Sequence, residues 1–169
     1  MSKNIVLVGF MGAGKSVVAK NLATALKRQV VSTDHLIEEK EKRPIADIFT
    51  DSGEAYFRTV EKAVVAEVSL KKDLIIDCGG GVILNQDNIE NLKKAGILFY
   101  LATSPDVVYE RVKSQRHRPL LNVPDPKRKI EELLTSRKAK YEQAHYTIDT
   151  SLKTVTQVVD EILKLISHE

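Results

Sequence analysis

The segment from Gly9 to Ser16 has a composition and spacing suited to binding phosphate. It reads Gly-Phe-Met-Gly-Ala-Gly-Lys-Ser, which is the Walker A pattern G-x-x-x-x-G-K-S. Glycines let backbone N–H groups turn toward phosphate oxygens, while a lysine can reach the β and γ phosphates and a serine hydroxyl can bind Mg²⁺. The sequence therefore predicts a nucleotide site, without separating kinases from ATPases or GTPase switches. The predicted nucleotide-binding residues of this loop are Gly12, Ala13, Gly14, Lys15, Ser16 and Val17.

Short β-rich runs alternate with longer segments of helical period, and these predicted strands and helices must position the Walker A loop. The predicted strands are 4–10, 29–33, 74–78, 97–103 and 146–149. The predicted helices are 17–28, 54–70 and 126–144, and Ser104-Pro105 has the cap and first-position proline that open another. Such alternation indicates a three-layer α/β/α domain with a parallel sheet covered on both faces. The loop would then follow the first strand and precede a helix, as a phosphate site requires.

Two further carboxylates follow or end predicted strands. Asp34 comes at the end of the second strand, where ligands of open α/β sheets bind, and it could equally cap a helix starting at His35. Asp77 ends the third strand, where a carboxylate could help hold Mg²⁺ or could cap local backbone. Cys78 beside it lies in an apolar run and is interpreted as a small buried core residue.

Glycines and arginines mark the remaining candidate sites. Gly79, Gly80 and Gly81 follow the third strand, and three successive glycines exceed what a simple turn needs. Arg58 suits a carboxylate ligand, although on its own a helix-surface network with Glu54 and Glu61 is the more ordinary interpretation.

Three more arginines are weak signals individually. Arg118 lies in the basic, proline-containing stretch 114–126, which lacks periodicity and resembles a surface loop. Arg111 could pair with Asp106 or Glu110, and Arg137 sits in a run of basic residues expected to be exposed.

Together these segments resemble the shikimate kinase family across nearly the whole chain. The matching segments are the Walker A loop, Ser32-Thr33-Asp34, the G-E-x-x-F-R segment 53–58, the glycine triplet and the R-P-L-L sequence 118–121. The resemblance implies a P-loop NTPase fold with a five-stranded parallel sheet in the order 2-3-1-4-5. It implies one domain over 1–169, with a lid at about 113–126 and a substrate-binding helical segment at about 34–62.

The same resemblance implies an ATP-dependent phosphorylation of shikimate that requires Mg²⁺ and belongs to aromatic amino acid biosynthesis. Lys15, Asp34 and Arg118 would be catalytic, with Asp34 accepting the proton of the attacking hydroxyl. Arg111 and Arg118 would contact the nucleotide. The substrate-binding residues would be Asp34, Arg58, Gly79, Gly80, Gly81 and Arg137.

The chain departs from the family pattern at the magnesium site. Most members carry an acidic residue two places before the substrate aspartate, and here that residue is Ser32. Asp77 stands where a Walker B aspartate would be and where the family often has serine. The hypothesis is that Ser16 and Asp77 together serve the metal.

Composition narrows the remaining classes of function. The 169 residues are 43% hydrophobic and 29% charged with a net charge of +3, which fits one compact domain and argues against a dedicated nucleic-acid surface. A segment long and apolar enough to cross a membrane is absent from the sequence, as is the N-K-x-D signature of GTP switches. The four histidines have no spacing typical of a metal site or triad. A cytoplasmic monomer acting on small molecules is expected.

Overall fold

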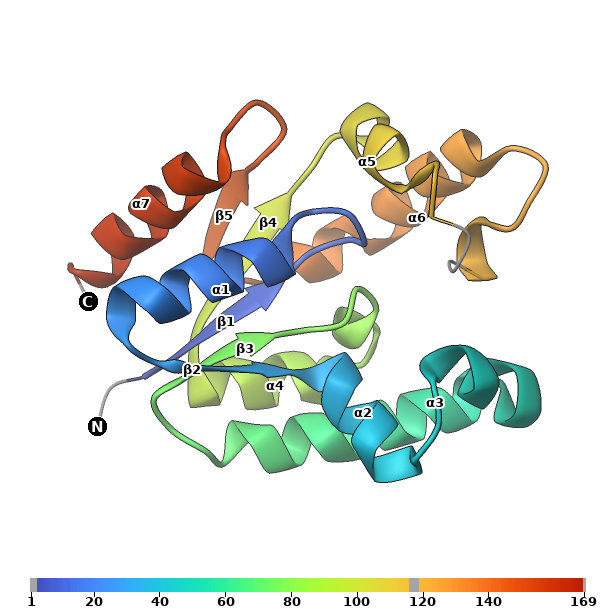
Figure 1. The fold of residues 1–169 in the computed structure, drawn as a ribbon, viewed down its shortest axis with the longest axis horizontal. Coiled ribbons are helices and arrows are strands. Elements are labelled where there is room, and N and C mark those ends of the chain that lie inside the picture. The colour runs from blue at the N-terminus through green and yellow to red at the C-terminus, as the bar shows by residue number, and fades with distance from the viewer. Residues whose placement is uncertain (1–2, 116–118, 169) are drawn as a thin grey trace.

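Five parallel strands form one sheet in the order β2-β3-β1-β4-β5 (Figure 1). The computed structural model describes residues 3–115 and 119–168. This sheet confirms the predicted α/β class and strand order. All five strands were predicted, with ends that differ by up to two residues. Their bounds are β1 (Asn4–Val8), β2 (Gln29–Ser32), β3 (Leu74–Asp77), β4 (Gly96–Ala102) and β5 (Tyr146–Asp149).

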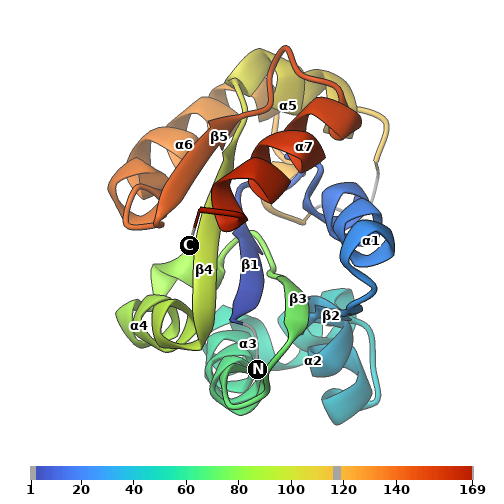
Figure 2. The same cartoon turned by 90° about the vertical axis from the view of Figure 1, so that its left-hand side faces the viewer.

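Helices cover both faces of this sheet, as Figures 1 and 2 show. Helices α1 and α7 pack on one face, and α3, α4 and α6 pack on the other. The bounds are α1 (Lys15–Leu26), α2 (Thr33–Glu41), α3 (Ile45–Ser69), α4 (Gln86–Ala95), α5 (Pro105–Val112), α6 (Pro126–Tyr141) and α7 (Val155–Ile166). Two short 3₁₀ segments are η1 (Val82–Leu84) and η2 (Pro119–Leu121).

The central strand β1 divides the core between the two faces. Ile5 and Leu7 point toward α1 and α7, whereas Val6 and Val8 point toward α3 and α4. All four side chains are almost fully buried, and burying each contributes about 1.5–3 kcal/mol. This two-sided burial explains why the strand is continuously apolar rather than alternating.

Helices α4 and α7 were not predicted, although their start signals are in the sequence. Thr154 and Gln157 form a reciprocal capping box at the start of α7. The Asn85 side chain accepts a hydrogen bond from the Asp87 N–H at the start of α4. The predicted start of α5 is confirmed, because Ser104 caps the helix through the Val107 N–H.

Helix α3 is bent at Gly53, which has φ 83° and ψ 169°. The part before the bend contributes Ile45 and Phe49, and the part after it contributes Phe57; all three pack against a small core. The bend lets one continuous segment both pack along the sheet and turn across its carboxyl edge.

Parallel strands all present their carboxyl ends at the same edge of the sheet. The Walker A loop follows β1, Asp34 lies in the first turn of the helix after β2, and the glycine triplet follows β3. The candidate groups are therefore neighbours in space. Within the part of the chain that the structure describes, no helix is long and apolar enough to span a bilayer.

Candidate active site

The Walker A loop is shaped by glycines in left-handed conformations. Gly12 has φ 76° and Gly14 has φ 87°, conformations that L-residues rarely adopt. The Lys15 ammonium donates to the carbonyls of Gly9 at 2.8 Å and Phe10 at 3.1 Å. Since α1 begins at Lys15, the loop also presents the positive end of a helix, which favours an anion.

The other predicted loop residues differ in their surroundings. Ala13 is buried in the core beside the sheet, whereas Val17 is half exposed on the first turn of α1. Arg111 donates to the Gly12 carbonyl at 2.8 Å, so it lies against the loop. The alternative in which Arg111 pairs with Asp106 or Glu110 is wrong, because these acids pair with Lys127 and Lys113.

Ser16 and Asp77 meet directly at the base of the loop. The Ser16 hydroxyl donates to Asp77 Oδ2 at 2.6 Å, and Asp77 is only 7% exposed. These are two hard oxygen donors next to the phosphate loop, which suits Mg²⁺ completed by phosphate and water oxygens. Within the described residues, no group of three or more acidic, histidine or cysteine side chains could hold a metal unaided. Cys78 next to Asp77 is buried, and burial raises the pKa of its thiol well above the usual value, as expected of a core residue.

Ser32 caps α2, so the alternative in which Asp34 caps this helix is wrong. The Ser32 hydroxyl accepts a hydrogen bond from the His35 N–H at 3.3 Å, while Asp34 lies inside the first helical turn. The helix starts two residues earlier than expected, so Asp34 is not its cap. Its carboxylate instead lies against Gly79, where a Cβ atom would overlap Asp34 Oδ1. Gly79 is further fixed because its N–H donates to the Thr33 hydroxyl at 2.9 Å.

Arg58 makes the predicted helix network and also lines a pocket. It pairs with Glu61 at 2.8 Å and with Glu54 at 3.4 Å, and its guanidinium fills the space where Gly81 would carry a Cβ. Glu61 is almost fully buried, and this desolvation raises the pKa of its carboxyl even though Arg58 lowers it. The helix network of Arg58 is therefore confirmed, and its role toward a carboxylate ligand stays a prediction. Glu61 also lines this pocket, although sequence reasoning treated it only as a partner of the arginine.

Arg137 is buried, contrary to the expectation of an exposed basic run. It is 5% exposed, and its guanidinium lies 5.7 Å from the centre of the Phe10 ring. Its Nη1 donates to the Gly80 carbonyl at 3.5 Å. The helical period of α6 turns this residue inward while the adjacent Lys138 is exposed, and the sequence pattern of a basic run did not reveal this difference.

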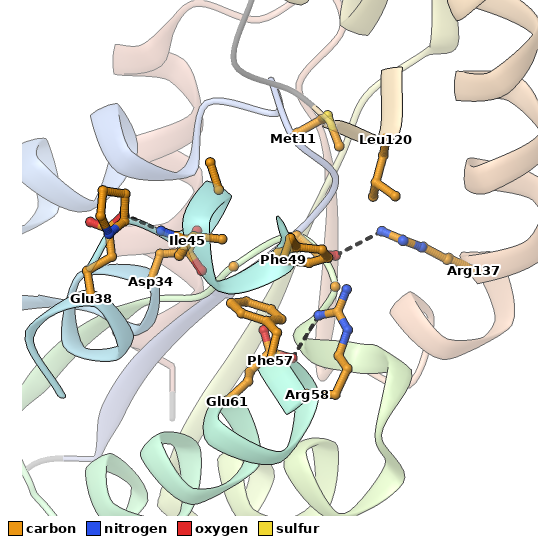
Figure 3. A pocket seen from close by; sticks show the side chains of 15 residues that line it. Met11, Asp34, Glu38, Ile45, Phe49, Phe57, Arg58, Glu61, Leu120 and Arg137 are labelled. Atoms are coloured by element: carbon orange, nitrogen blue, oxygen red, sulfur yellow. Dashed lines mark hydrogen bonds and ion pairs between the residues drawn. The ribbon is translucent and has the colours of Figure 1, made fainter. Parts of the chain in front are cut away.

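These side chains surround a pocket of about 490 Å³ (Figure 3). Arg58 and Arg137 reach into it from α3 and α6, and Asp34 lies on another side. The sequence did not identify the apolar part of this lining, because its members look like ordinary core positions. That part consists of Met11, Pro44, Ile45, Ala46, Phe49, Phe57 and Leu120.

A second pocket of about 280 Å³ adjoins the first at the Walker A loop. It is lined by the loop residues, Ser32, Asp77 and Cys78. Both pockets are lined by Met11, Asp34, Gly79 and Gly80. A carboxylate at the boundary between the pocket at the Walker A loop and the pocket lined by two arginines could accept a proton from a hydroxyl held there.

The predicted lid is described only in part. Arg118, with the neighbouring residues 116 and 117, lies outside the described residues. Immediately after them, η2 places Leu120 in the lining of the larger pocket.

Comparisons with known proteins point to one family. The family model for shikimate kinase matches residues 11–167. The chain is 44% identical over 162 residues to a shikimate kinase of Caldanaerobacter subterraneus subsp. tengcongensis, covering 96% of this chain and 95% of the relative.

Solved structures give the same result. A shikimate kinase from Acinetobacter baumannii in complex with shikimate has a TM-score of 0.95 at 41% identity, covering 99% of this chain and 94% of the other. A shikimate kinase from Aquifex aeolicus has a TM-score of 0.85 at 32% identity, covering 97% and 96%.

Proposed function

This chain belongs to the shikimate kinase family, and on that premise we propose how its residues carry out the reaction. The reaction is the ATP-dependent phosphorylation of a hydroxyl of shikimate, in the biosynthesis of aromatic amino acids. The observation that carries the proposal is the pair of adjoining pockets that meet at Asp34.

The smaller pocket is assigned to the phosphates of ATP. Backbone N–H groups at the start of α1 and the Lys15 ammonium lie where negative charge must be neutralised. Lys15 would exchange its bonds to loop carbonyls for bonds to phosphate oxygens. Arg111, held on the Gly12 carbonyl, would contact the nucleotide beside the loop.

The larger pocket is assigned to shikimate. Among the residues that the structure describes, Arg58 and Arg137 are the arginines that line it, and a guanidinium donates two parallel hydrogen bonds to a carboxylate. The glycine triplet presents backbone without side chains next to Asp34 and Arg58, and the Gly80 carbonyl accepts a hydrogen bond from Arg137. With the carboxylate anchored there, a ring hydroxyl would face the smaller pocket.

Transfer then needs positioning and charge neutralisation more than covalent chemistry by the protein. The hydroxyl oxygen attacks the γ phosphorus, the bond from that phosphorus to the bridging oxygen breaks, and ADP leaves with those electrons. Asp34 accepts the hydroxyl proton, which keeps the charges balanced.

Ser16 and Asp77 fit a magnesium site and would hold the ion beside the β and γ phosphates. Bound there, Mg²⁺ would neutralise charge that develops on the phosphate oxygens. Most family members have an acidic residue at the position of Ser32, and the carboxylate of Asp77 would replace it here. Ser32 and Asp77 are paired at the ends of the neighbouring strands β2 and β3. The Ser32 hydroxyl instead caps the start of α2.

The family resemblance extends the proposal to the rest of the chain. A single domain would close a lid at about 113–126 through Arg118 and use a substrate-binding segment at about 34–62. Closure would exclude water and so limit hydrolysis of ATP. A cytoplasmic monomer is proposed because one chain supplies the lining of both pockets and ATP is available in that compartment.

A coupled assay of ADP release with ATP and Mg²⁺ tests the function directly. Shikimate, gluconate, a nucleoside monophosphate and no acceptor would be compared. Turnover only with shikimate supports the assigned pockets. Turnover with another acceptor, or equally without one, contradicts the roles given to Asp34, Arg58 and the glycine triplet.

A further inference from the structure

Two side chains of α6 bind the same backbone carbonyl of the glycine triplet. The Tyr141 hydroxyl donates to the Gly80 carbonyl at 2.5 Å, and Arg137 Nη1 donates to it at 3.5 Å. The two residues are four apart, so they lie on one face of the helix. Gly80 itself lines both pockets.

The other two carbonyls of the triplet are held by backbone. Gly79 and Gly81 accept hydrogen bonds from the N–H groups of Val82 and Leu84, which form the tight turns of η1. The Gly80 carbonyl instead depends on α6. Because glycine has no side chain to restrict its backbone, this peptide group would otherwise rotate readily.

Fixing this carbonyl also fixes the next amide. The peptide unit is planar, and in its trans form the C=O of Gly80 and the N–H of Gly81 point in opposite directions. A carbonyl held toward α6 therefore holds the Gly81 N–H facing away from Tyr141. Gly81 is the glycine that lies against the Arg58 guanidinium.

Tyr141 is rigid enough to act as such an anchor. It is fully buried, and its ring stacks on Tyr100 with centroids 4.7 Å apart and planes within 3°. Burial raises the pKa of the Tyr141 hydroxyl to about 12, so it remains a proton donor at physiological pH. Lys140 next to it donates to the Leu84 carbonyl at 2.8 Å, which ties the same end of α6 to η1.

We propose that Tyr141 is a positioning residue for the larger pocket, which is assigned to shikimate. By holding the Gly80 carbonyl, Tyr141 orients the Gly81 amide and the Arg137 guanidinium. This inference rests on the proposed function. Without the hydroxyl, Arg137 would be the remaining side-chain donor to this carbonyl among the described residues. The arginine would be drawn toward the carbonyl and away from the carboxylate of the substrate, because an unpaired buried carbonyl is costly.

The test compares Tyr141→Phe with the matched control Tyr100→Phe. Both variants keep the stacked ring pair and remove one hydroxyl, but only the first removes the bond to Gly80. Titration calorimetry would give separate dissociation constants for shikimate and ATP, with thermal unfolding measured alongside. For Tyr141→Phe we expect about tenfold weaker shikimate binding, the equivalent of one hydrogen bond, and ATP binding changed less than about twofold.

Steady-state kinetics should show the same division, with the KM for shikimate raised and kcat nearly constant. ¹⁵N-glycine spectra provide a second measurement, in which the amide signal of Gly81 should move in Tyr141→Phe and stay in Tyr100→Phe. Unchanged shikimate binding, or equal weakening of both ligands or in both variants, would overturn the inference. Failure of the unaltered protein to bind shikimate would instead contradict the proposed function.

Discussion

Ser16 and Asp77 are 61 positions apart in the chain, yet their side chains share a hydrogen bond of 2.6 Å. Each residue has an ordinary explanation alone, as a loop hydroxyl and as the last residue of a strand. Their direct contact supports the hypothesis of a shared metal site more than either position does. The role that we propose for each of these two residues thus rests on its contact with the other.

Replacing Asp77 with Asn should raise the Mg²⁺ concentration needed for half-maximal activity by about ten- to a hundredfold. The amide keeps the size of the side chain and can still accept from Ser16, but it loses the charge that attracts the cation. Activity would be titrated with Mg²⁺ at saturating ATP and shikimate. Asp106→Asn removes an exposed carboxylate elsewhere and is the control. An unchanged magnesium requirement in Asp77→Asn would refute the metal role.

Replacing Glu61 with Gln should change the pH dependence of stability. Burial raises the pKa of Glu61 above its ordinary 4.5, so the folded state holds this proton at pH values where the unfolded state has lost it. The contribution of Glu61 to stability is therefore full below about pH 4.5 and is lost as the pH rises through the folded pKa. Gln cannot ionise, so the variant should gain stability relative to the original protein over that rise.

Urea unfolding of both proteins from pH 4 to pH 7 measures this difference. Glu54→Gln is the matched control, because Glu54 pairs with the same Arg58 but is about half exposed, and solvent screens it. We expect a smaller dependence on pH for that control. A difference between Glu61→Gln and the original protein that stays constant with pH would contradict the argument.

At the scale of elements, the bent helix α3 connects the sheet to the larger pocket. Its first part supplies Ile45 and Phe49 to the lining, and its second part supplies Arg58 and Glu61. Lys140 and Tyr141 of α6 donate hydrogen bonds to carbonyls of the segment after β3. The positions of these pocket residues therefore depend on how α3 and α6 pack.

Replacing Gly53 with Ala should disturb this placement through the backbone alone. A Cβ there would meet nothing within 4 Å, but φ 83° with ψ 169° is a conformation nearly restricted to glycine and costs other residues about 1–3 kcal/mol. We expect a loss of unfolding free energy in that range and a raised KM for shikimate with the KM for ATP unchanged. Stability would be measured by denaturant unfolding, and both KM values by the coupled assay.

The nearby exposed residue Ala55 provides the control for this change. Ala55→Gly should cost up to about 1 kcal/mol by helix propensity without altering the bend. If both variants raised the KM for shikimate equally, the bend at Gly53 would have no special role in shaping the pocket.

At the scale of the whole molecule, both pockets belong to the folded state only. Each is assembled from segments that follow different strands, so an unfolded chain cannot bind in the same way. Shikimate at a hundred times its dissociation constant should therefore add about 2.7 kcal/mol to the free energy of unfolding. For a chain of this length, that gain raises the melting temperature by about 5–10 °C.

Thermal unfolding with shikimate, gluconate and no addition measures this effect. Gluconate is the control for general binding of a polyhydroxy carboxylate. Equal shifts with both acids would indicate general ion binding and would contradict the assigned pocket.

The sequence by itself determined the parallel α/β sheet and the phosphate loop, because both depend on local patterns. Apolar runs of strand length alternate with helical periods, and Gly12, Gly14 and Lys15 lie within four consecutive positions of the phosphate loop. The assignment of Asp34, Arg58 and the glycine triplet to one pocket came from a family resemblance instead. Asp34 and Arg58 each had an ordinary structural explanation alone, whereas three successive glycines exceed what a simple turn needs.

Only the tertiary structure decided the contacts between distant segments. It placed Asp77 on Ser16 and buried Arg137 beside Phe10. The hydroxyl of Tyr141 on the Gly80 carbonyl has no local signature at all. Such contacts depend on helix packing and strand order, which bring together residues that a one-dimensional pattern leaves 60 positions apart or more.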